Sequence, residues 1–238
     1  MTDDRLISAL DFHAADDAKR LVEQLGDSVN FYKVGMELFY SVGSGVLEWL
    51  KARDKKIFLD LKLHDIPNTV AEGLCSLLHF DVDILNIHAS GGFTMMQTAA
   101  DRLKNRAEQL GVRRPKLIAI TVLTSINGND WQELGYQNNM TNQVVRLAKL
   151  AQKAGLDGVV ASPREALAIR DQCGADFLIV TPGIRPAGAS IDDQSRIATP
   201  AAALKNGANY LVIGRPIRAA ADPRAAALKI IAEMNSVE

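Results

Sequence analysis

The sequence has few cysteines, few aromatic residues and no excess of charge of either sign. Its two cysteines, Cys75 and Cys173, are too few for a disulfide framework or a zinc site. Lysine and arginine total 27 against 28 aspartate and glutamate residues, a net charge of −1. This balance gives no electrostatic reason to expect nucleic-acid binding.

Long apolar runs are also absent. The longest, residues 117–123, is far shorter than the roughly 20 residues that span a bilayer, so no membrane attachment is expected. The first residues carry acids at positions 3 and 4 and no basic stretch ahead of an apolar one, so we expect no secretory signal. These features together predict a cytoplasmic protein.

Two kinds of segment alternate along the chain. Short runs rich in isoleucine, valine and leucine are typical of buried strands, and longer segments have the apolar spacing of helices. The predicted strands are residues 6–12, 30–35, 56–62, 83–89, 116–122, 157–162, 177–183 and 210–216. The predicted helices are residues 16–26, 44–52, 67–78, 93–110, 141–155, 163–173, 200–207 and 222–234.

Strict alternation of apolar strands with helices predicts an α/β fold with a parallel sheet covered by helices. Eight strand–helix units in 238 residues average about 30 residues each, the size of one βα repeat. We therefore expect one domain over residues 1–238, a single (β/α)8 TIM barrel with its active site at the carboxyl ends of the strands. The alternative, an open doubly wound sheet, usually has a glycine-rich turn after its first strand, but this turn reads LDFHAADDAK.

Charged residues gather at the predicted carboxyl ends of the first three strands. Asp60 and Lys62 are two residues apart on one strand and therefore face the same side, while Asp11 and Lys33 arrive from the neighbouring strands. For each charge alone, a solvated side chain or a structural ion pair is as good an explanation as a functional role. Four charges of alternating sign at one barrel mouth favour a functional site, because inward-pointing charges are costly unless paired.

Two long loops follow the fifth and seventh predicted strands, at residues 124–140 and 183–200. Loops of this length are usually functional or disordered. The second loop lies next to the turn at Gly214 and Arg215, and the loops after strands seven and eight of such barrels commonly bind phosphate. An ordinary turn with a surface arginine is the alternative. Two lone histidines, His64 and His88, are expected to be structural or peripheral.

The stretch FLDLKLHDIPNTV at residues 58–70 resembles the signature of the orotidine 5′-monophosphate decarboxylase family, whose D-x-K-x-x-D core is matched by Asp60, Lys62 and Asp65. The resemblance covers the whole chain. The other matching segments are LDF with Asp11, YKVGMELF with Lys33, LTS with Thr124, the TPGIRP loop, Gln194 and VIGRPI with Arg215.

The resemblance implies decarboxylation of orotidine 5′-monophosphate to UMP and CO₂ without a metal or another cofactor, as the last step of UMP synthesis. It implies that Lys62 stabilises the carbanion at C6 and then protonates it, and that Asp60 and Asp65 keep Lys62 charged. It also implies a homodimer in which Asp65, Ile66 and Thr69 enter the partner's site. The remaining implied roles are Lys33 in the charge network and with Asp11 at the ribose, Thr124 and Ser125 at the uracil edge, and Arg185, Gln194, Gly214 and Arg215 at the phosphate.

Three alternatives remain open. Related sugar-phosphate barrels, 3-keto-L-gulonate-6-phosphate decarboxylase and hexulose-phosphate synthase, share the D-x-K-x-x-D core but use Mg²⁺ and an acidic ligand near the end of the second strand. Lys33 stands there in this sequence, although Glu37 follows a few residues later. A Schiff-base aldolase would need a neutral lysine, which flanking acids disfavour. A non-catalytic phosphate-binding barrel would not need the lysine–aspartate array.

Overall fold

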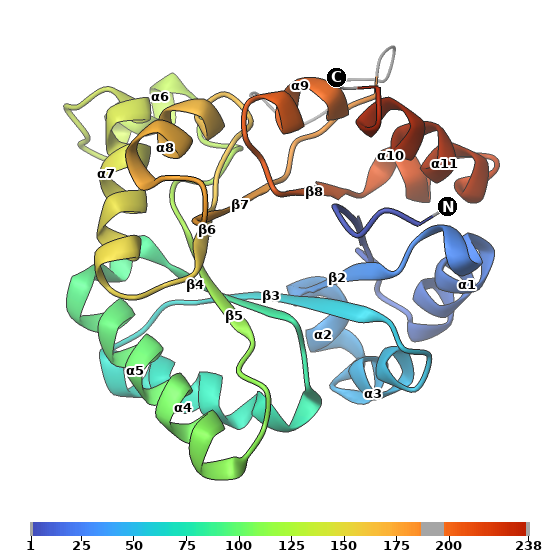
Figure 1. Cartoon of the computed structure of the whole chain (residues 1–238), viewed down its shortest axis with the longest axis horizontal. Helices are drawn as coiled ribbons and strands as arrows, with labels where there is room; N and C mark the ends of the chain where they lie inside the picture. Colours follow the sequence, from blue (N-terminus) through green and yellow to red (C-terminus); the bar gives the residue numbers. More distant parts are fainter. Residues whose placement is uncertain (1, 187–197, 237–238) are drawn as a thin grey trace.

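A computed structural model of the protein describes residues 2–186 and 198–236. Eight parallel strands form a closed barrel in sequence order, and β8 pairs with β1 (Figure 1). The strands are β1 Leu6–Ala9, β2 Phe31–Gly35, β3 Lys56–Leu63, β4 Ile84–His88, β5 Lys116–Ile120, β6 Gly158–Val160, β7 Leu178–Thr181 and β8 Tyr210–Ile213. The predicted (β/α)8 barrel is confirmed.

Helices surround the barrel and cover the outer face of its sheet (Figure 1). They are α1 Ala15–Leu25, α2 Met36–Val42, α3 Gly45–Lys51, α4 Pro67–Ser76, α5 Gly92–Leu110, α6 Gly128–Glu133, α7 Met140–Lys153, α8 Ala166–Cys173, α9 Pro200–Lys205, α10 Arg215–Arg218 and α11 Pro223–Met234. Each predicted helix has a counterpart whose ends lie within about three residues of the predicted ones.

The structure differs from the sequence prediction in the segment after β5. Residues 124–140 were expected to be a loop, but they contain the short helix α6 and the start of α7. Asn127 caps α6 by accepting hydrogen bonds from the backbone N–H groups of Asn129 and Asp130, and the Asp130 side chain accepts one from the N–H of Asn127. This reciprocal cap stabilises a helix too short to show a clear apolar period.

Strand residues alternate between two apolar cores. The core inside the barrel contains Ile7, Ala9, Phe31, Phe58, Ile84, Ile118, Val180 and Val212. The larger core between the strands and the helices includes the alternate residues, such as Leu6, Tyr32 and Leu59. Burial on both faces explains why the strands have nearly continuous apolar sequences.

Arg170 on α8 ties together the loops that enter β7 and β8. Its guanidinium donates hydrogen bonds to the backbone carbonyls of Gly174, Ala175, Phe177 and Gly207 at 2.6–2.7 Å. It also bonds at 2.7 Å to Oδ1 of Asn209, which accepts the N–H of Ile179 as well. A charged donor shared among several carbonyls gives stronger bonds than a neutral one.

We predict that Arg170→Met lowers the Tm by about 5–10 °C. Losing charge-assisted bonds and leaving carbonyls unpaired costs about 2–3 kcal/mol, and each kcal/mol shifts the Tm of a chain of this size by about 2–4 °C. Thermal denaturation followed by circular dichroism would measure it. The control is Arg146→Met, which removes an exposed arginine of α7. Equal Tm values for the two variants would contradict the role of Arg170.

Candidate active site

A cavity of about 310 Å³ opens at the carboxyl ends of the strands. Its charged lining comes from Lys33 on β2 and from Asp60 and Lys62 on β3, and Thr124 and Ser125 contribute hydroxyls beyond β5. The rest of its lining is apolar: Phe58, Ile120, Val122, Leu123, Val160, Pro182 and Val212. A concave, mostly apolar site with a few convergent polar groups is the usual form of a small-molecule site.

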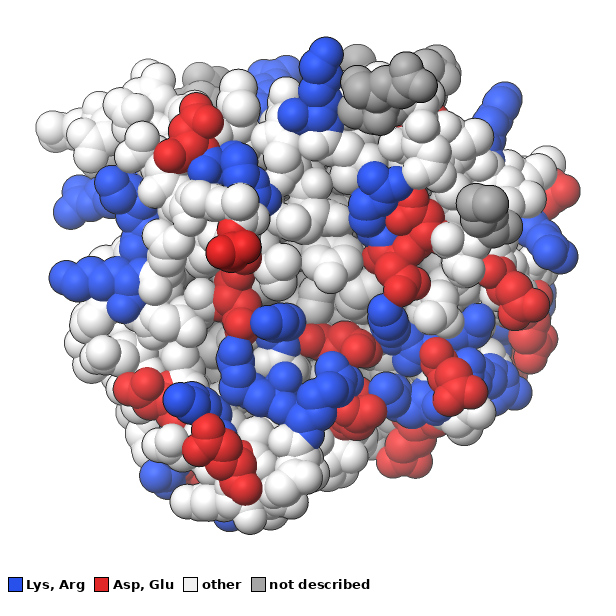
Figure 2. All heavy atoms as spheres, in the orientation of Figure 1, with Lys and Arg blue, Asp and Glu red and all other residues white. Residues whose placement is uncertain are grey.

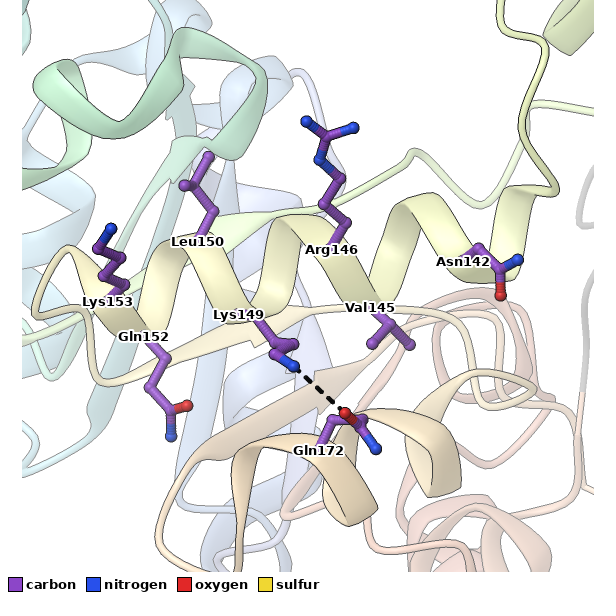
Figure 3. Close-up of a pocket in the computed structure, with 8 residues that line it drawn as sticks. All are labelled: Asn142, Val145, Arg146, Lys149, Leu150, Gln152, Lys153 and Gln172. Carbon is purple, nitrogen blue, oxygen red and sulfur yellow. Dashed lines mark hydrogen bonds between the residues drawn. The ribbon is translucent and has the colours of Figure 1, made fainter.

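A second hollow of about 650 Å³ lies outside the barrel, and its lining comes from α7 and from Gln172 of α8 (Figure 3). The Lys149 ammonium donates a 3.3 Å hydrogen bond to Gln172 across it. This hollow has basic and amide side chains but no carboxylate among its lining residues. It therefore lacks the acid–base pairs that the barrel mouth provides.

Figure 2 shows basic and acidic side chains interspersed on one face of the molecule. This agrees with the balanced composition, 27 basic against 28 acidic residues.

Among the described residues, no helix is long and apolar enough to cross a membrane. Within the same ranges, no group of three histidine, cysteine or acidic side chains is arranged to hold a metal ion.

The four charged residues singled out in the sequence form one continuous chain of alternating charge. Lys33 Nζ lies 2.8 Å from Asp11 Oδ1 and 3.4 Å from Asp60 Oδ2. Lys62 Nζ lies 2.7 Å from the other oxygen of that carboxylate, Asp60 Oδ1. The barrel thus orders the charges as Asp11, Lys33, Asp60 and Lys62, and every neighbouring pair attracts.

Lys33 remains positively charged although it is buried. Burial alone lowers the pKa of its ammonium, but the carboxylates of Asp60 and Asp11 together raise the pKa by more, so it lies above its ordinary value. An ammonium between two carboxylates is a fixed charge rather than a neutral nucleophile.

A change of backbone conformation places Lys62. Its φ is +54°, which is uncommon for a residue with a side chain, and the pairing of β3 with β4 shifts register between Leu59 and Leu63. Leu61 and Leu63 pack against the outer core, as the alternation predicts. Lys62 is therefore at a local irregularity of the strand, with its ammonium in the cavity.

Asn86 on β4 is a buried polar residue that the sequence analysis missed. Its Oδ1 accepts the backbone N–H of Lys62 at 2.8 Å, and its Nδ2 donates to Asp60 Oδ1 at 2.6 Å. The available signal was an amide inside the apolar run ILNIH, because a polar side chain in a buried strand needs a specific partner.

The residues after β3 lie on the surface at the start of α4. Asp65, Ile66 and Thr69 are all exposed, and Ile66 is 66% accessible. The Asp65 carboxylate accepts the N–H of Ile66 at 2.6 Å, and it makes no ion pair with another described residue. The structure does not bring these three residues into the cavity of their own chain.

The residues expected at the phosphate have different settings. Gly214 precedes α10, and a Cβ built on it would lie 3.5 Å from Asp11 Oδ2, so this turn adjoins the charged array. Arg215 is the first residue of α10. Arg185 is only 7% exposed, donates to the carbonyl of Ile184 at 3.0 Å and does not line the cavity. Gln194 lies outside the described residues.

Glu37, the acid considered as a metal ligand, is directed elsewhere. It lies in the first turn of α2, and its Oε1 is 3.3 Å from Nε2 of His13. Glu37 does not line the cavity. The end of β2 therefore presents Lys33 to the site rather than a carboxylate.

The two histidines near the site lie against each other. The ring centroids of His64 and His88 are 5.2 Å apart. Burial, together with the nearby His64 and Lys62, lowers the pKa of the His88 imidazole below its ordinary value. His88 is therefore neutral at pH 7, in the half-buried position at the end of β4.

We predict that His88 makes the folded state less stable as the pH falls from 7 to 5. Since its pKa is lower in the folded state, the unfolded chain binds more protons in this range and stability is lost on acidification. His88→Gln removes this proton uptake, so the wild-type Tm should fall relative to that of the variant. Comparison at pH 8, where both side chains are neutral, supplies the baseline. If the wild-type Tm rises relative to that of the variant as the pH falls, the pKa of His88 is not lowered in the folded state.

The fold and the site define a (β/α)8-barrel protein with an alternating aspartate–lysine array at the carboxyl ends of its strands. The family model described as "Orotidine 5'-phosphate decarboxylase / HUMPS family" matches residues 4–230. The chain therefore belongs to the orotidine 5′-phosphate decarboxylase / HUMPS family.

Similar proteins carry the name of the decarboxylase. The chain is 49% identical over 236 residues to orotidine 5′-phosphate decarboxylase of Moorella thermoacetica, covering 99% of this chain and 94% of that protein. It is 46% identical to the Nostoc sp. protein of the same name, over the full length of both. The crystal structure of the Lactobacillus acidophilus enzyme superposes with a TM-score of 0.86 at 42% identity, covering 98% of this chain and 100% of that chain.

Proposed function

We propose that this protein decarboxylates orotidine 5′-monophosphate to UMP and CO₂, the final step of de novo pyrimidine nucleotide biosynthesis. The observation that carries the proposal is the array in which the Lys62 ammonium lies 2.7 Å from Asp60 at the mouth of the barrel. The extensive similarity to proteins named orotidine 5′-phosphate decarboxylase supports the choice of substrate.

In this reaction the bond between C6 and the carboxylate of the orotate ring breaks, CO₂ leaves and the electron pair remains on C6. The Lys62 ammonium stabilises that negative charge and donates a proton to C6 to give UMP. A fixed cation aimed at the developing charge lowers the barrier without rearranging at the moment of reaction. Asp60, held between Lys33 and Lys62, attracts both ammonium groups and helps to raise the pKa of Lys33 above its ordinary value.

The other candidate residues are assigned to binding. Asp11 and Lys33 hold the ribose hydroxyls, and Thr124 and Ser125, which line the cavity, meet the uracil edge. Gly214 and Arg215 bind the phosphate at the start of α10. The assignment of Arg185 and Gln194 to the phosphate rests on sequence resemblance alone.

The alternative chemistries fit the array less well. A Schiff-base mechanism needs a neutral amine, but the pKa of Lys33 is raised and Lys62 contacts a carboxylate. The Mg²⁺-dependent relatives need an acidic ligand near the end of β2, where Lys33 faces the cavity and Glu37 pairs with His13. We therefore assign the reaction without a metal or another cofactor.

The proposal includes a homodimer with shared active sites and a cytoplasmic location. The exposure of Asp65, Ile66 and Thr69 leaves them available to reach the site of a second copy. There Asp65 would lie near Lys62 and add a second carboxylate to the array. Both cysteines, Cys75 and Cys173, are free, which suits a reducing compartment.

We predict that the wild type still consumes orotidine 5′-monophosphate after exhaustive dialysis against EDTA. We also predict that Lys62→Ala lowers kcat by ~10³-fold or more, because the substitution deletes a charge interaction of the transition state. The measurement is the loss of orotidylate absorbance in the ultraviolet, and UMP binding by calorimetry should survive. The control is Lys104→Ala, which removes an exposed lysine of α5.

Three outcomes would contradict parts of this scheme. Wild-type protein that binds UMP without turnover would favour a non-catalytic binding barrel. Activity that EDTA removes and Mg²⁺ restores would favour the sugar-phosphate branch of the family. Near-normal turnover of Lys62→Ala would exclude Lys62 as the proton donor.

We predict that two inactive variants, Lys62→Ala and Asp65→Ala, complement each other when they are mixed, unfolded and refolded. Random assortment makes about half of the dimers hybrid, and the two-fold symmetry of the interface gives each hybrid one intact and one doubly damaged site. Activity should recover to about a quarter of the wild-type value. If mass spectrometry finds hybrids but no activity returns, Asp65 does not act across the interface.

A further inference from the structure

The side chain of Asn86 is completely buried beside the charged array. Asn86 lies in the middle of β4, and its exposed fraction is 0%. Its neighbours on the strand, Leu85 and Ile87, pack into the outer core, so the amide faces the barrel interior. A buried amide needs partners at both of its ends.

The partners of Asn86 fix the orientation of its amide. A backbone N–H can only donate, so the group 2.8 Å from the N–H of Lys62 is the oxygen Oδ1. The Asp60 carboxylate in its ion pairs can only accept, so the group 2.6 Å from its Oδ1 is the nitrogen Nδ2. One side chain thus holds the carboxylate of Asp60 and the main chain of Lys62.

The hydrogen bond to Lys62 coincides with its unusual backbone. A residue with a side chain at φ +54° is strained unless its surroundings hold it there. At this point β3 and β4 shift register, and the N–H of Lys62 bonds to the Asn86 side chain. The amide therefore replaces a strand-to-strand hydrogen bond where the strand turns Lys62 into the cavity.

The hydrogen bond to Asp60 acts on the same oxygen that pairs with the lysine. Asp60 Oδ1 accepts a 2.6 Å hydrogen bond from Nδ2 of Asn86 and lies 2.7 Å from Nζ of Lys62. The other carboxylate oxygen, Oδ2, lies 3.4 Å from Nζ of Lys33. Three donors around one carboxylate leave it little freedom to rotate. His88, two residues further along β4, and His64, whose ring centroid lies 5.2 Å from that of His88, are further titratable groups near this part of the array.

We propose that Asn86 is a positioning residue, which sets the placement of Lys62 against Asp60 by bonding to the backbone of one and the carboxylate of the other. This inference rests on the proposed function and deepens it. Asn86 does not line the cavity, so it acts through Asp60 and Lys62 and not on the substrate.

The bridge needs a side chain that accepts at one end and donates at the other. Leucine has nearly the same shape but can make neither of the two hydrogen bonds. Aspartate accepts the N–H of Lys62 but sets a second negative charge against Asp60. When it is protonated, however, aspartate can accept at one oxygen and donate from the other, as the amide does. The neighbouring carboxylate favours this protonated form by raising the pKa of the pair.

The test compares Asn86→Leu and Asn86→Asp with Asn209→Leu, which removes an amide at the opposite end of the barrel. Asn86→Leu should lower kcat by ~100-fold, the effect of a displacement near 1 Å, and should change the affinity for UMP by less than about threefold, because the phosphate end is untouched. Asn209→Leu should lower the Tm but leave kcat within about twofold.

The pH profile separates positioning from general damage. The kcat of Asn86→Asp relative to the wild type should rise at least about tenfold as the pH falls from 8 to 5, as protonation restores the donor to Asp60. The relative kcat of Asn86→Leu should stay flat over the same range. A kcat of Asn86→Leu near that of the wild type, or equal pH profiles of the two variants, would overturn the proposal.

A crystal structure of Asn86→Leu gives a readout independent of turnover. We expect Lys62 to leave its positive φ and its ammonium to move more than about 1 Å from Asp60. If φ and the 2.7 Å contact persist, the positioning role is wrong even where turnover falls. If the wild type itself has no decarboxylase activity, the proposed function fails, while this structural result still decides the role of Asn86.

Discussion

Pairing of β8 with β1 closes the sheet, and the whole arrangement at the mouth of the barrel depends on that closure. Leu6, Ile7 and Ser8 pair with residues 211–213 of β8, which brings the turn at Gly214 beside Asp11. Pairing of β1 with β2 and of β2 with β3 places Lys33 and Asp60 next in line. An open sheet would leave β1 and β8 at opposite edges and would separate the turn at Gly214 from Asp11.

The aspartate–lysine array at the barrel mouth includes buried charged side chains. A fold tolerates buried charges only when charges of opposite sign are paired with each other. Removing Asp60 and Lys33 from water carries a desolvation cost that their attraction need not recover, so such an array is weak evidence for stability. Its value is positional. Alternating charges, held by the barrel and by the Asn86 amide, set a cation at a fixed place beside an apolar cavity. Fixed charges of this kind favour transition-state stabilisation.

The two ends of the barrel have different physical roles. At the amino ends of the strands, Arg170 joins loops by hydrogen bonds to carbonyls, and Arg114 forms a 2.8 Å ion pair with Asp157. These contacts bind secondary-structure elements to one another. At the carboxyl ends, charges converge on a cavity and the backbone departs from regular geometry at Lys62. Stability and candidate chemistry are thus separated along the barrel axis, as in other barrels of this type.

The local pattern of the chain determined the strands, most of the helices and the residue types of the array. Apolar periodicity and helix caps depend on residues close together in the sequence, so the sequence alone can predict them. Asp60 and Lys62 were predicted to face the same side because they lie two residues apart on one strand. The short helices α2, α6 and α10 were not predicted, because a helix of so few residues shows no clear apolar period.

Only the tertiary structure decided which groups meet across strands. It joined Asp11 to Lys33, turned Lys62 to a positive φ, buried Arg185 and made Asn86 a bridge between Asp60 and Lys62. These outcomes depend on strand register and on pairing between residues more than twenty positions apart, which a local sequence pattern does not encode.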